Sequence, residues 1–479
     1  MEVDEESKME ATTEPVIVVP MDVDAQTIQE SADVAKTTKR KIQDDEDDFN
    51  ADDLFKEDNN RSNVKLGGMA GEAIKSLDAG FSTLIKIFYQ RVFPVTEFYK
   101  WLSYGNVQKN YFPNREISFA FENDVVVRHL SYADAAEFKT DLVKNSPAKI
   151  DIGPVYNMRP KDKKTVRNNA FHALERELVF DIDMTDYDDI RICCKGADIC
   201  HKCWDFMTIS IKIIDRAIRE DFGFKHRIWV YSGRRGVHCW ICDERARKLN
   251  AELRTAIVKH IEVIKGGEQM IKKVNLGFGP LHPTLVPAMR ILEEYFPKTC
   301  LVNQDILGTQ ESWNKILKMT NDEDMRRELD ELWLKHPKLT SKQKWEQLLD
   351  EYEKRKGRKI ASAFRRDVMF QYLYPRLDDK VSTGVNHLLK SPFCVHPKTG
   401  RVCVPIIPEE CESFDPLTVP TLQTLVEELN SGGPDGRPSV PPSFAPHLAH
   451  FKTFIKGMED EIRASLRAKR VDEDKKLQF

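Results

Sequence analysis

The sequence predicts a mixed α/β fold, an α/β or α+β core interrupted by helices, and three observations support this class. Segments with the pattern of strands are short and widely spaced along the 479 residues. Helical patterns lie between these segments rather than in one block. The run from 310 to 365 is dense in Lys, Glu, Leu and Trp and poor in Gly, which indicates a helical insertion. A chain of this length can bury a sizeable core and is expected to hold two or three structural units.

The composition argues against a membrane-spanning or secreted protein, and the overall charge does not indicate a particular class of partner. Charged residues make up 31% of the chain, but the formal net charge is only −4. Acidic residues are concentrated at 44–48 and 52–58, so any nucleic-acid surface must be a local patch on the remainder. No run of about 18 apolar residues occurs, and the apolar stretch 16–19 is too short for a signal peptide. We therefore expect a soluble, intracellular protein that does not contact a membrane.

Residues 1–72 are predicted to form a disordered acidic tail. Glu, Asp, Thr, Ser and Lys dominate and aromatic residues are almost absent, so the segment cannot bury enough surface to offset the entropy of ordering. Within it, Lys39-Arg40-Lys41 is either a nuclear import signal or a solvated run of charge. The stretch Val16–Val19 could add a strand to the sheet of a partner.

Helices and then strands follow the tail. From Ala73 to Tyr104 apolar residues recur at helical spacing, and Pro94 separates two helices. Glu116–Phe121 alternates in hydrophobicity and Asp124–His129 is rich in valine, which predicts two strands. The next segment is the basic loop Arg159–Arg167, which either follows a phosphate backbone or is simply solvated.

The central feature is the stretch Glu177–Asp189, ELVFDIDMTDYDD, an apolar run that ends in acids. Alternation along a strand places Asp181 and Asp183 on one face, about 7 Å apart at about 3.3 Å per residue. Two such carboxylates raise each other's pKa unless a cation lies between them. The pattern predicts a divalent-metal site, the alternative being a strand end with solvated acids. Three further acids follow where the chain must leave the strand and are not expected to be ligands: Asp186, Asp188 and Asp189.

Four of the ten cysteines fall within eleven residues: Cys193, Cys194, Cys200 and Cys203. Their density indicates a metal site in a reducing compartment rather than a disulfide framework. Four thiolates predict one tetrahedral, structural zinc ion, with unliganded thiols as the alternative. Because adjacent ligands require a tight chain reversal, His201 could replace one of the cysteines. Cys239 and Cys242 are also separated by two residues, but residues three apart on a strand face opposite sides, so we expect core thiols there.

A second candidate half-site lies on a predicted hairpin. After an amphipathic helix over Asp205–Asp221, the strands Arg227–Ser232 and Val237–Cys242 are joined by Gly233-Arg234-Arg235-Gly236. Glycines allow a ligand to approach the backbone, and arginine forks match phosphate oxygens. Together with Ser232 and His238, the turn predicts a site for a nucleoside triphosphate. Beside two metal-binding acids it would complete a phosphoryl-transfer site.

The remaining chain supplies further candidates. Helices are expected from Glu244 to about Lys265 and after Pro287, and short strands around Val368–Leu377 and Val402–Ile407. Asp378 is a candidate third acid at the end of one such strand. Candidates for phosphate or base contacts follow, each of which could instead be an ordinary solvated or core residue: His387, Lys390 and His396. The chain ends in a linker over Ser431–Pro446 and a charged helix from about His447 to Lys469.

The predicted domain organisation is discontinuous. It comprises the tail over 1–72, a first core part over 73–305 with the zinc motif at 193–203, the helical insertion over 306–365, a completing core part over 366–430, and the linker with the terminal helix over 431–479.

The motifs resemble those of the catalytic small subunits of eukaryotic DNA primases, within the archaeo-eukaryotic primase superfamily. The resemblance covers roughly residues 75–425 and rests on LVFDIDMTDYDD, the cysteine cluster, YSGRRGVHCW and GVNHLLKSPFCVHPKTGR. It implies a primase-type catalytic core of mixed α/β type, with a zinc-binding motif and an inserted helical subdomain. The acidic tail departs from the family pattern, so nothing is carried over to it.

The resemblance further implies a DNA-directed RNA polymerase that makes RNA primers for DNA replication by two-metal nucleotidyl transfer. It implies Asp181, Asp183 and Asp378 as ligands of two Mg²⁺ or Mn²⁺ ions, Glu116 as a further active-site acid, and the four cysteines as ligands of one Zn²⁺. The implied nucleotide contacts are Arg128, Asp151, Ser232, Gly233, Arg234, Arg235, Gly236, His238, His387, Lys390 and His396.

The partners implied by the resemblance are an iron–sulfur large subunit of primase, the catalytic and accessory subunits of DNA polymerase alpha, a single-stranded DNA template and ribonucleoside triphosphates. The implied location is the nucleus. Two alternatives stay open. A catalytically silent single-strand-binding scaffold would be free to lose Asp181, Asp183, Asp378 and His238, all of which are present. A nucleotidyltransferase that extends existing ends would use the same acids, and only synthesis without a primer separates it from a primase.

Overall fold

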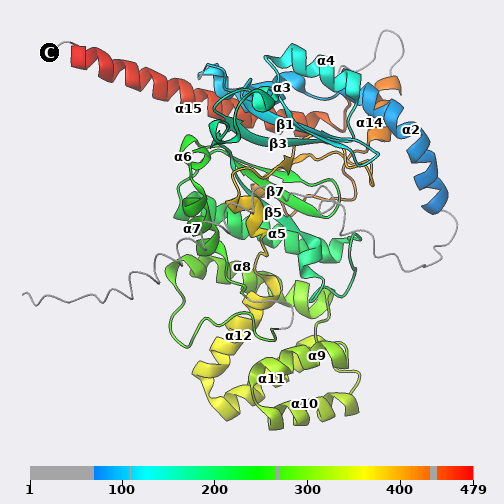
Figure 1. The fold of residues 1–479 in the computed structure, drawn as a ribbon. Coiled ribbons are helices and arrows are strands. Elements are labelled where there is room, and N and C mark those ends of the chain that lie inside the picture. The colour runs from blue at the N-terminus through cyan, green and yellow to red at the C-terminus, as the bar shows by residue number, and fades with distance from the viewer. Residues whose placement is uncertain (1–69, 108, 266–269, 432–439, 478–479) are drawn as a thin grey trace, which may run out of the picture. The chain divides into compact units, whose positions relative to one another are not determined.

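Two antiparallel sheets lie at the centre of the described part of the chain (Figure 1). The structure is a computed structural model that describes residues 70–107, 109–265, 270–431 and 440–477. These residues fall within one unit, Met69–Phe479. The predictions for the tail, including those for 16–19 and 39–41, lie outside the described residues. None of the described helices is long and apolar enough to cross a membrane.

The first sheet has the strand order β2-β1-β3-β4, and every neighbouring pair is antiparallel. Its strands are β1 (Arg115–Ala120), β2 (Val126–Leu130), β3 (Lys149–Tyr156) and β4 (Ala173–Glu175). β8 (Leu389–Lys390), from much later in the chain, also pairs with β3 and places Lys390 opposite Asp151. The strands predicted over 116–121 and 124–129 match β1 and β2 to within two residues.

The second sheet has the order β5-β7-β6-β9. Its strands are β5 (Leu178–Asp183), β6 (Arg227–Tyr231), β7 (Gly236–Ile241) and β9 (Pro405–Ile406). The predicted hairpin forms between β6 and β7, and β7 also pairs with β5, so that Asp181 lies opposite His238 and Asp183 opposite Gly236. β7 is buried along its whole length. The hairpin and the acidic strand are therefore neighbours in one buried sheet.

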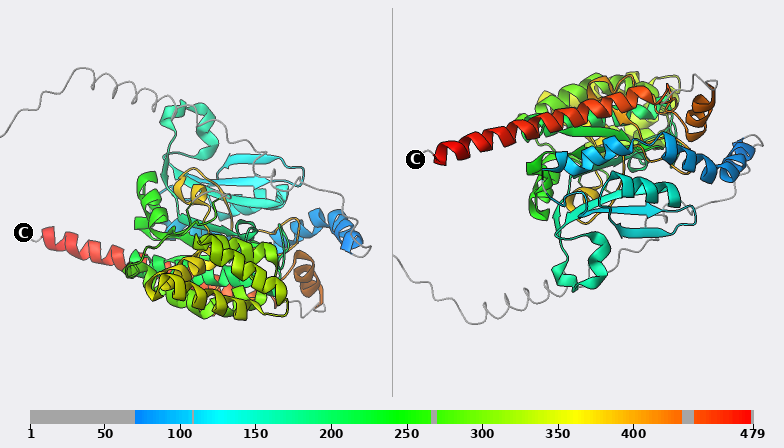
Figure 2. Two further views of the ribbon diagram at one scale, coloured as in Figure 1. Left: turned by 90° about the horizontal axis from the view of Figure 1, so that it is seen from below. Right: turned by 90° about the horizontal axis from the view of Figure 1, so that it is seen from above.

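Helices from both ends of the described chain pack together on this sheet. α3 (Val95–Ser103) and α15 (Ala445–Leu477) lie alongside each other (Figures 1 and 2). The Trp101 ring of α3 stands edge-on to Trp240 of β7 and to Phe451 of α15. The other helices around the sheets are α2 (Ala70–Arg91), α4 (Ala135–Asn145), α5 (His201–Arg216, continued by a π-helical turn over Ala217–Asp221), α6 (Glu244–Arg247), α7 (Ala251–Ile261) and α14 (Leu422–Ser431). The mixed α/β character expected from the sequence is confirmed.

A second group of helices lies between residues 286 and 383. It comprises α8 (Val286–Phe296), α9 (Gln310–Leu317), α10 (Glu323–Lys335), α11 (Ser341–Lys356), α12 (Arg358–Leu373) and α13 (Asp379–Thr383). α10 packs on α9 and α11, and α11 packs on α12. In Figure 1, α9, α10 and α11 lie on the side of α12 that faces away from the two sheets. The run from 310 to 365 is thus helical, as predicted.

The strand predicted over Val368–Leu377 is wrong. Residues 368–373 form the last turns of α12, and the chain then continues to Asp378 without helix or strand. Val368, Phe370 and Leu373 are fully buried, and Met369 and Tyr372 nearly so. An apolar segment buried on all sides shows no helical periodicity, so its sequence cannot be told from that of a buried strand.

Candidate active site

The acids predicted from distant parts of the chain lie together at the end of β5. Asp181 and Asp183 are the partly exposed positions of a strand whose other residues are buried. Asp378 precedes α13, and its backbone N–H donates to the carbonyl oxygen of Asp181 at 3.2 Å. Its carboxylate caps α13 by accepting from the N–H groups of Lys380 and Val381. The third predicted acid is therefore joined directly to the first.

The negative charge of this group is only partly compensated. Burial, Asp183 and Asp378 raise the pKa of Asp181 to about 8. Asp183 is paired with Arg235, whose Nε lies 2.8 Å from both carboxylate oxygens. A divalent cation would relieve the repulsion at Asp181, and carboxylate oxygens are the ligands that Mg²⁺ and Mn²⁺ prefer. The donor set fits a divalent-metal site.

The Gly233–Gly236 turn lies directly beside the acids. Gly233 has φ of +89°, and a Cβ there would lie 2.7 Å from the Cβ of His396. A Cβ on Gly236 would lie 2.4 Å from the carbonyl oxygen of Ile182. The turn is closed by the N–H of Gly236, which donates to the Oγ of Ser232 at 3.0 Å. Both glycines are thus required by packing of the chain on itself, a reason that differs from the ligand approach expected from the sequence.

Cationic side chains surround the turn. The Nζ of Lys390 on β8 donates to the carbonyl oxygen of Ser232 at 3.3 Å, which ties the first sheet to the second. Burial and four cations lower the pKa of His396 to about 2, the cations being Lys390, Arg234, Lys398 and Arg235. Several cationic side chains close to one neutral imidazole create a region of positive potential, which is the environment expected of a site for a polyanion.

His238 stands between these cations and the acids. Its Nε2 lies 3.6 Å from Oδ1 of Asp181. Burial and Lys390 lower the pKa of His238 to about 3. The imidazole is therefore neutral at pH 7, and its contact with Asp181 is polar rather than an ion pair.

The first sheet contributes a second acid–base group. Glu116 is fully buried and accepts from the Nε of Arg128 (3.0 Å), the backbone N–H of His129 (3.1 Å) and the hydroxyl of Tyr156 (3.1 Å). Asp151 pairs with the Nζ of Lys149 at 3.0 Å. The predicted contacts Glu116, Arg128 and Asp151 are thus brought together on one sheet.

His387 connects this group to the acids of the second sheet. Burial and Arg176 lower the pKa of His387 to about 4, against the opposing charges of Asp378 and Asp151. Arg128 also donates to the carbonyl oxygen of Asn386, the residue that precedes His387, at 3.4 Å. The residues predicted from the two sheets therefore form one continuous polar region.

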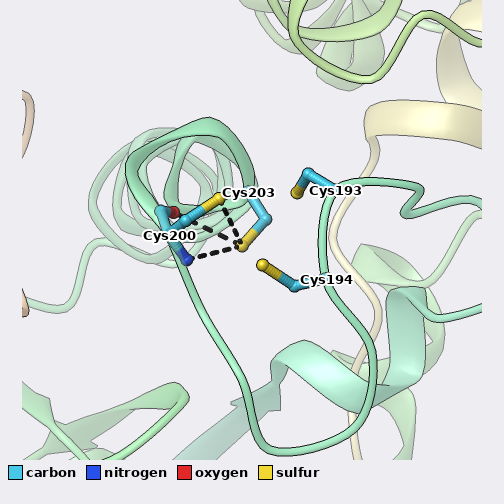
Figure 3. A group of neighbouring side chains, drawn as sticks. All are labelled: Cys193, Cys194, Cys200 and Cys203. Atoms are coloured by element: carbon cyan, nitrogen blue, oxygen red, sulfur yellow. Dashed lines mark hydrogen bonds between the residues drawn. The ribbon is translucent and has the colours of Figure 1, made fainter. Parts of the chain in front are cut away.

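The four clustered cysteines converge from a loop and from the start of α5 (Figure 3). Their sulfur atoms all lie within 4.8 Å of one another, and those of Cys200 and Cys203 are 3.9 Å apart. Zinc–sulfur bonds of about 2.3 Å place tetrahedral ligands about 3.8 Å apart, so the group fits a zinc ion. Among the described residues, only these cysteines form a group of three or more possible ligands that all lie within 4.8 Å of one another. The carboxylate oxygens of Asp181, Asp183 and Asp378 do not form such a group.

The surroundings favour the thiolate form at Cys203. They do not do so at Cys194, where burial raises the pKa to about 11, or at Cys193, whose pKa is raised by its hydrogen bond with Cys203. A hydrogen bond from Cys193 and the guanidinium of Arg191, 3.8 Å away, lower the pKa of Cys203 to about 5, against the effect of burial. His201 lies outside the group, since its Nε2 contacts Asp415 at 3.1 Å. It therefore does not replace a cysteine.

The other residues that are predicted not to bind metal have the following surroundings. Cys239 and Cys242 are buried and lie outside the group of four sulfurs. Asp188 pairs with Arg191, and Asp189 pairs with Arg376 and Lys273. Asp186 is exposed, and its charge contributes to the raised pKa of Asp181.

The basic segment Arg159–Arg167 joins the site through a stack of rings. Phe171 stacks on Tyr156 with 4.0 Å between ring centroids, and Tyr156 donates to Glu116. The Nζ of Lys163 lies 5.7 Å from the centroid of Phe171. Lys164 and Arg167 are exposed. The segment is therefore a basic surface that is packed against the active-site region.

Comparison with known proteins identifies the family. A family model described as the DNA primase small subunit matches residues 180–408. A DNA primase small subunit of Schizosaccharomyces pombe is 42% identical over 374 residues, covering 77% of this chain and 81% of that protein. One of Saccharomyces cerevisiae is 34% identical over 402 residues, covering 82% and 96%. This chain belongs to the DNA primase small subunit family.

The match also reaches archaeal members of the primase family. The PriS protein of Archaeoglobus fulgidus is 25% identical over 310 residues, or 64% of this chain and 76% of that protein. Family membership makes the chain an enzyme of the nucleotidyltransferase class, a DNA-directed RNA polymerase. The resemblance drawn from the sequence motifs is confirmed.

Two further residues contact the candidate site and are not among those predicted from the sequence. Tyr156 donates to Glu116, and the fully buried Arg176 donates to the end of α13. The sequence signal for Arg176 is its place two residues before the apolar run of β5, because a charged side chain next to a buried strand must find partners inside the protein.

Proposed function

We propose that the chain is the catalytic subunit of a primase, which synthesises short RNA primers de novo on a single-stranded DNA template for DNA replication. One observation carries this proposal: Asp181, Asp183 and Asp378 lie beside a turn with two arginines, in a region strongly positive at His396. Acids for metal ions and cations for phosphate are the two halves of a phosphoryl-transfer site.

In this proposal Asp181, Asp183 and Asp378 hold two Mg²⁺ or Mn²⁺ ions. Such ions, when bound, lower the pKa of an attacking hydroxyl and neutralise charge on the phosphates. Arg235 would exchange part of its ion pair with Asp183 for the triphosphate, since a guanidinium binds either anion bidentately.

The other contacts divide between the two sheets. Ser232, Arg234, Lys390 and the two neutral imidazoles of His238 and His396 hold the triphosphate. Of these, only Arg234 and Lys390 add positive charge to that of Arg235. Glu116, Arg128, Asp151 and His387 position the incoming nucleotide from the first sheet. Starting a chain requires two free nucleotides to be held without a primer, so proximity must replace the affinity of a bound end, and initiation should be slower than extension.

We extend the proposal to the remaining parts of the molecule. The four cysteines hold one structural Zn²⁺, which has no open position for catalysis. The helices α9–α11 form a subdomain inserted into the catalytic core. The partners are the large subunit of primase and the subunits of DNA polymerase alpha, and the location is the nucleus.

We assign the template strand to the basic segment beside Glu116. The template surface consists of Lys163, Lys164 and Arg167. These side chains offer cations for a phosphate backbone. Their segment is packed through Phe171 and Tyr156 against Glu116. A strand held there would lead into the proposed nucleotide site.

The decisive test is synthesis without a primer, on single-stranded template with ribonucleotides, with and without the large subunit. The Asp181→Ala variant should make no product while retaining its zinc. The matched Asp186→Asn variant, which changes the neighbouring acid excluded from the metal site, should remain active. Full activity of Asp181→Ala would overturn the metal assignment, and products only from pre-existing ends would favour the end-extending enzyme.

A further inference from the structure

A fully buried arginine lies behind the acids. Arg176 lies between β4 and β5, two residues before β5 begins at Leu178, and is 0% exposed. Its Nη1 donates to the carbonyl oxygens of Val381 at 3.1 Å and Gly384 at 2.6 Å. Its Nε and Nη2 have no hydrogen-bond partner among the described residues. Burying a guanidinium that has only neutral hydrogen-bond acceptors is unfavourable.

The two carbonyls belong to the end of α13. This helix spans Asp379–Thr383, and Gly384 is its C-cap. The last carbonyls of a helix have no partner within the helix and carry partial negative charge, which a cation stabilises. Arg176 therefore holds the C-terminal end of the helix whose N-terminal end is capped by Asp378.

Both attachments of α13 come from one short piece of chain. At the N-terminal end, the N–H of Asp378 donates to the carbonyl oxygen of Asp181. At the C-terminal end the donor is Arg176, on the segment that leads into the same strand. The helix is thus fastened at each end to the segment that carries Asp181 and Asp183.

From this geometry we infer that Arg176 is a positioning residue that fixes Asp378 relative to Asp181 and Asp183, so that the three carboxylates are held as one rigid unit. The inference rests on the metal role proposed above for these acids. It gives the buried charge a task that a purely structural arginine would not have.

The bonding pattern predicts which substitutions are tolerated. Both bonds come from one nitrogen, so the single ammonium of Arg176→Lys can make them. Arg176→Met keeps an unbranched apolar stem, but it is shorter than arginine and has no donor. A matched control is Arg254→Lys. Arg254 is also fully buried and donates to the backbone of the same segment, at the carbonyls of Arg176 and of Glu177 (3.1 Å). Within the described residues it makes no hydrogen bond to α13.

The test is Mn²⁺ binding to the full chain, followed by electron paramagnetic resonance without nucleotide or template, alongside thermal unfolding. Arg176→Met should weaken Mn²⁺ binding about 10-fold or more, as loss of residues that orient metal ligands typically does. Arg176→Lys should bind like the wild type. Arg254→Lys should unfold at a lower temperature yet keep its Mn²⁺ affinity.

Three outcomes would overturn the inference. The first is wild-type Mn²⁺ affinity in Arg176→Met while Asp378→Ala binds weakly. The second is a loss of affinity that follows the loss of thermal stability equally in Arg176→Met and Arg254→Lys, since Arg176 would then be merely structural. The third is unchanged binding in Asp378→Ala, which removes the metal role itself and so identifies a failure of the proposed function.

Discussion

Gly236 is the residue at which one added methyl group conflicts most directly with the site. A Cβ added there would lie 2.4 Å from the carbonyl oxygen of Ile182, the residue that separates Asp181 from Asp183 in the chain. Gly236→Ala must push β7 away from β5, and overpacking of this kind costs about 2 kcal/mol. We expect unprimed synthesis to fall more than about 10-fold, because a 1 Å displacement at a reacting centre has effects of about 100-fold.

Gly457 on α15 provides the control for that change. A Cβ there would meet nothing within 4 Å. Since alanine is favoured over glycine within helices by up to about 1 kcal/mol, Gly457→Ala should leave activity unchanged and stability equal or higher. Urea unfolding and primer assays on both variants make the comparison, and wild-type activity in Gly236→Ala would show that the turn does not need its close packing.

The buried pair Arg115–Glu177 makes stability depend on acid pH. Burial alone would raise the pKa of Glu177, but the ion pair with Arg115 and the hydrogen bond from Tyr104 outweigh it and lower the pKa to about 2. A carboxyl whose pKa is depressed on folding stabilises the protein above its unfolded pKa, about 4.3. That stability is lost as the pH falls towards 2.

The difference in free energy of unfolding between the wild type and Glu177→Gln, called the stability gap below, should therefore decrease as the pH falls from 5 to 2. The expected decrease is on the order of 3 kcal/mol. Urea unfolding at several pH values measures the gap. Tyr104→Phe, which removes one bond to the carboxylate, should show a smaller narrowing and serves if the glutamine variant does not fold. A gap that stays constant with pH would contradict the depressed pKa.

At the scale of elements, the cysteine group ties the loop after β5 to the start of α5. Metal ligands that converge only in the folded chain make metal binding part of the folding free energy. We expect one zinc per chain in the wild type, and Cys203→Ser should lose that zinc and unfold at a lower temperature. Chelation should lower the unfolding temperature of the wild type in the same way.

The matched change for this prediction is Cys411→Ser, a buried cysteine outside the group. It should keep its zinc, as measured by atomic absorption, whatever its effect on stability. Zinc retained in Cys203→Ser, or lost in Cys411→Ser, would place the metal elsewhere.

Elements with a local signal were predictable and those set by long-range packing were not. The alternation of LVFDID and the Gly-Arg-Arg-Gly turn lead directly to β5 and to the β6–β7 hairpin. The end of α12 is buried on every side, so the pattern of its sequence does not distinguish helix from strand. The position of Asp378 against Asp181 and the task of Arg176 depend on α13 folding back onto β5, and no local pattern encodes that contact.

At the scale of the whole molecule, the active-site region lies where the two sheets meet. Lys390 of the first sheet bonds to Ser232 beside the second, so displacement of either sheet would separate the cations from the acids. The formal net charge of −4 does not reveal this arrangement, because positive charge is collected at the turn and at the template surface, while many of the acids fall in residues 44–48 and 52–58.

The template surface should therefore control affinity for DNA more than chemistry. The double variant Lys164→Glu, Arg167→Glu should weaken binding of single-stranded DNA and reduce the salt dependence of binding, by about 0.7 in slope for each phosphate that is no longer neutralised. Its rate at saturating template should stay near that of the wild type, because neither side chain lies among the acids.

The control is Arg358→Glu, Lys359→Glu, the same change of charge at exposed residues that begin α12. Fluorescence anisotropy over a range of salt concentrations separates the two variants. Equal reductions of affinity in both would mean that the chain attracts DNA through general charge, and the template strand would then have no defined place beside Glu116.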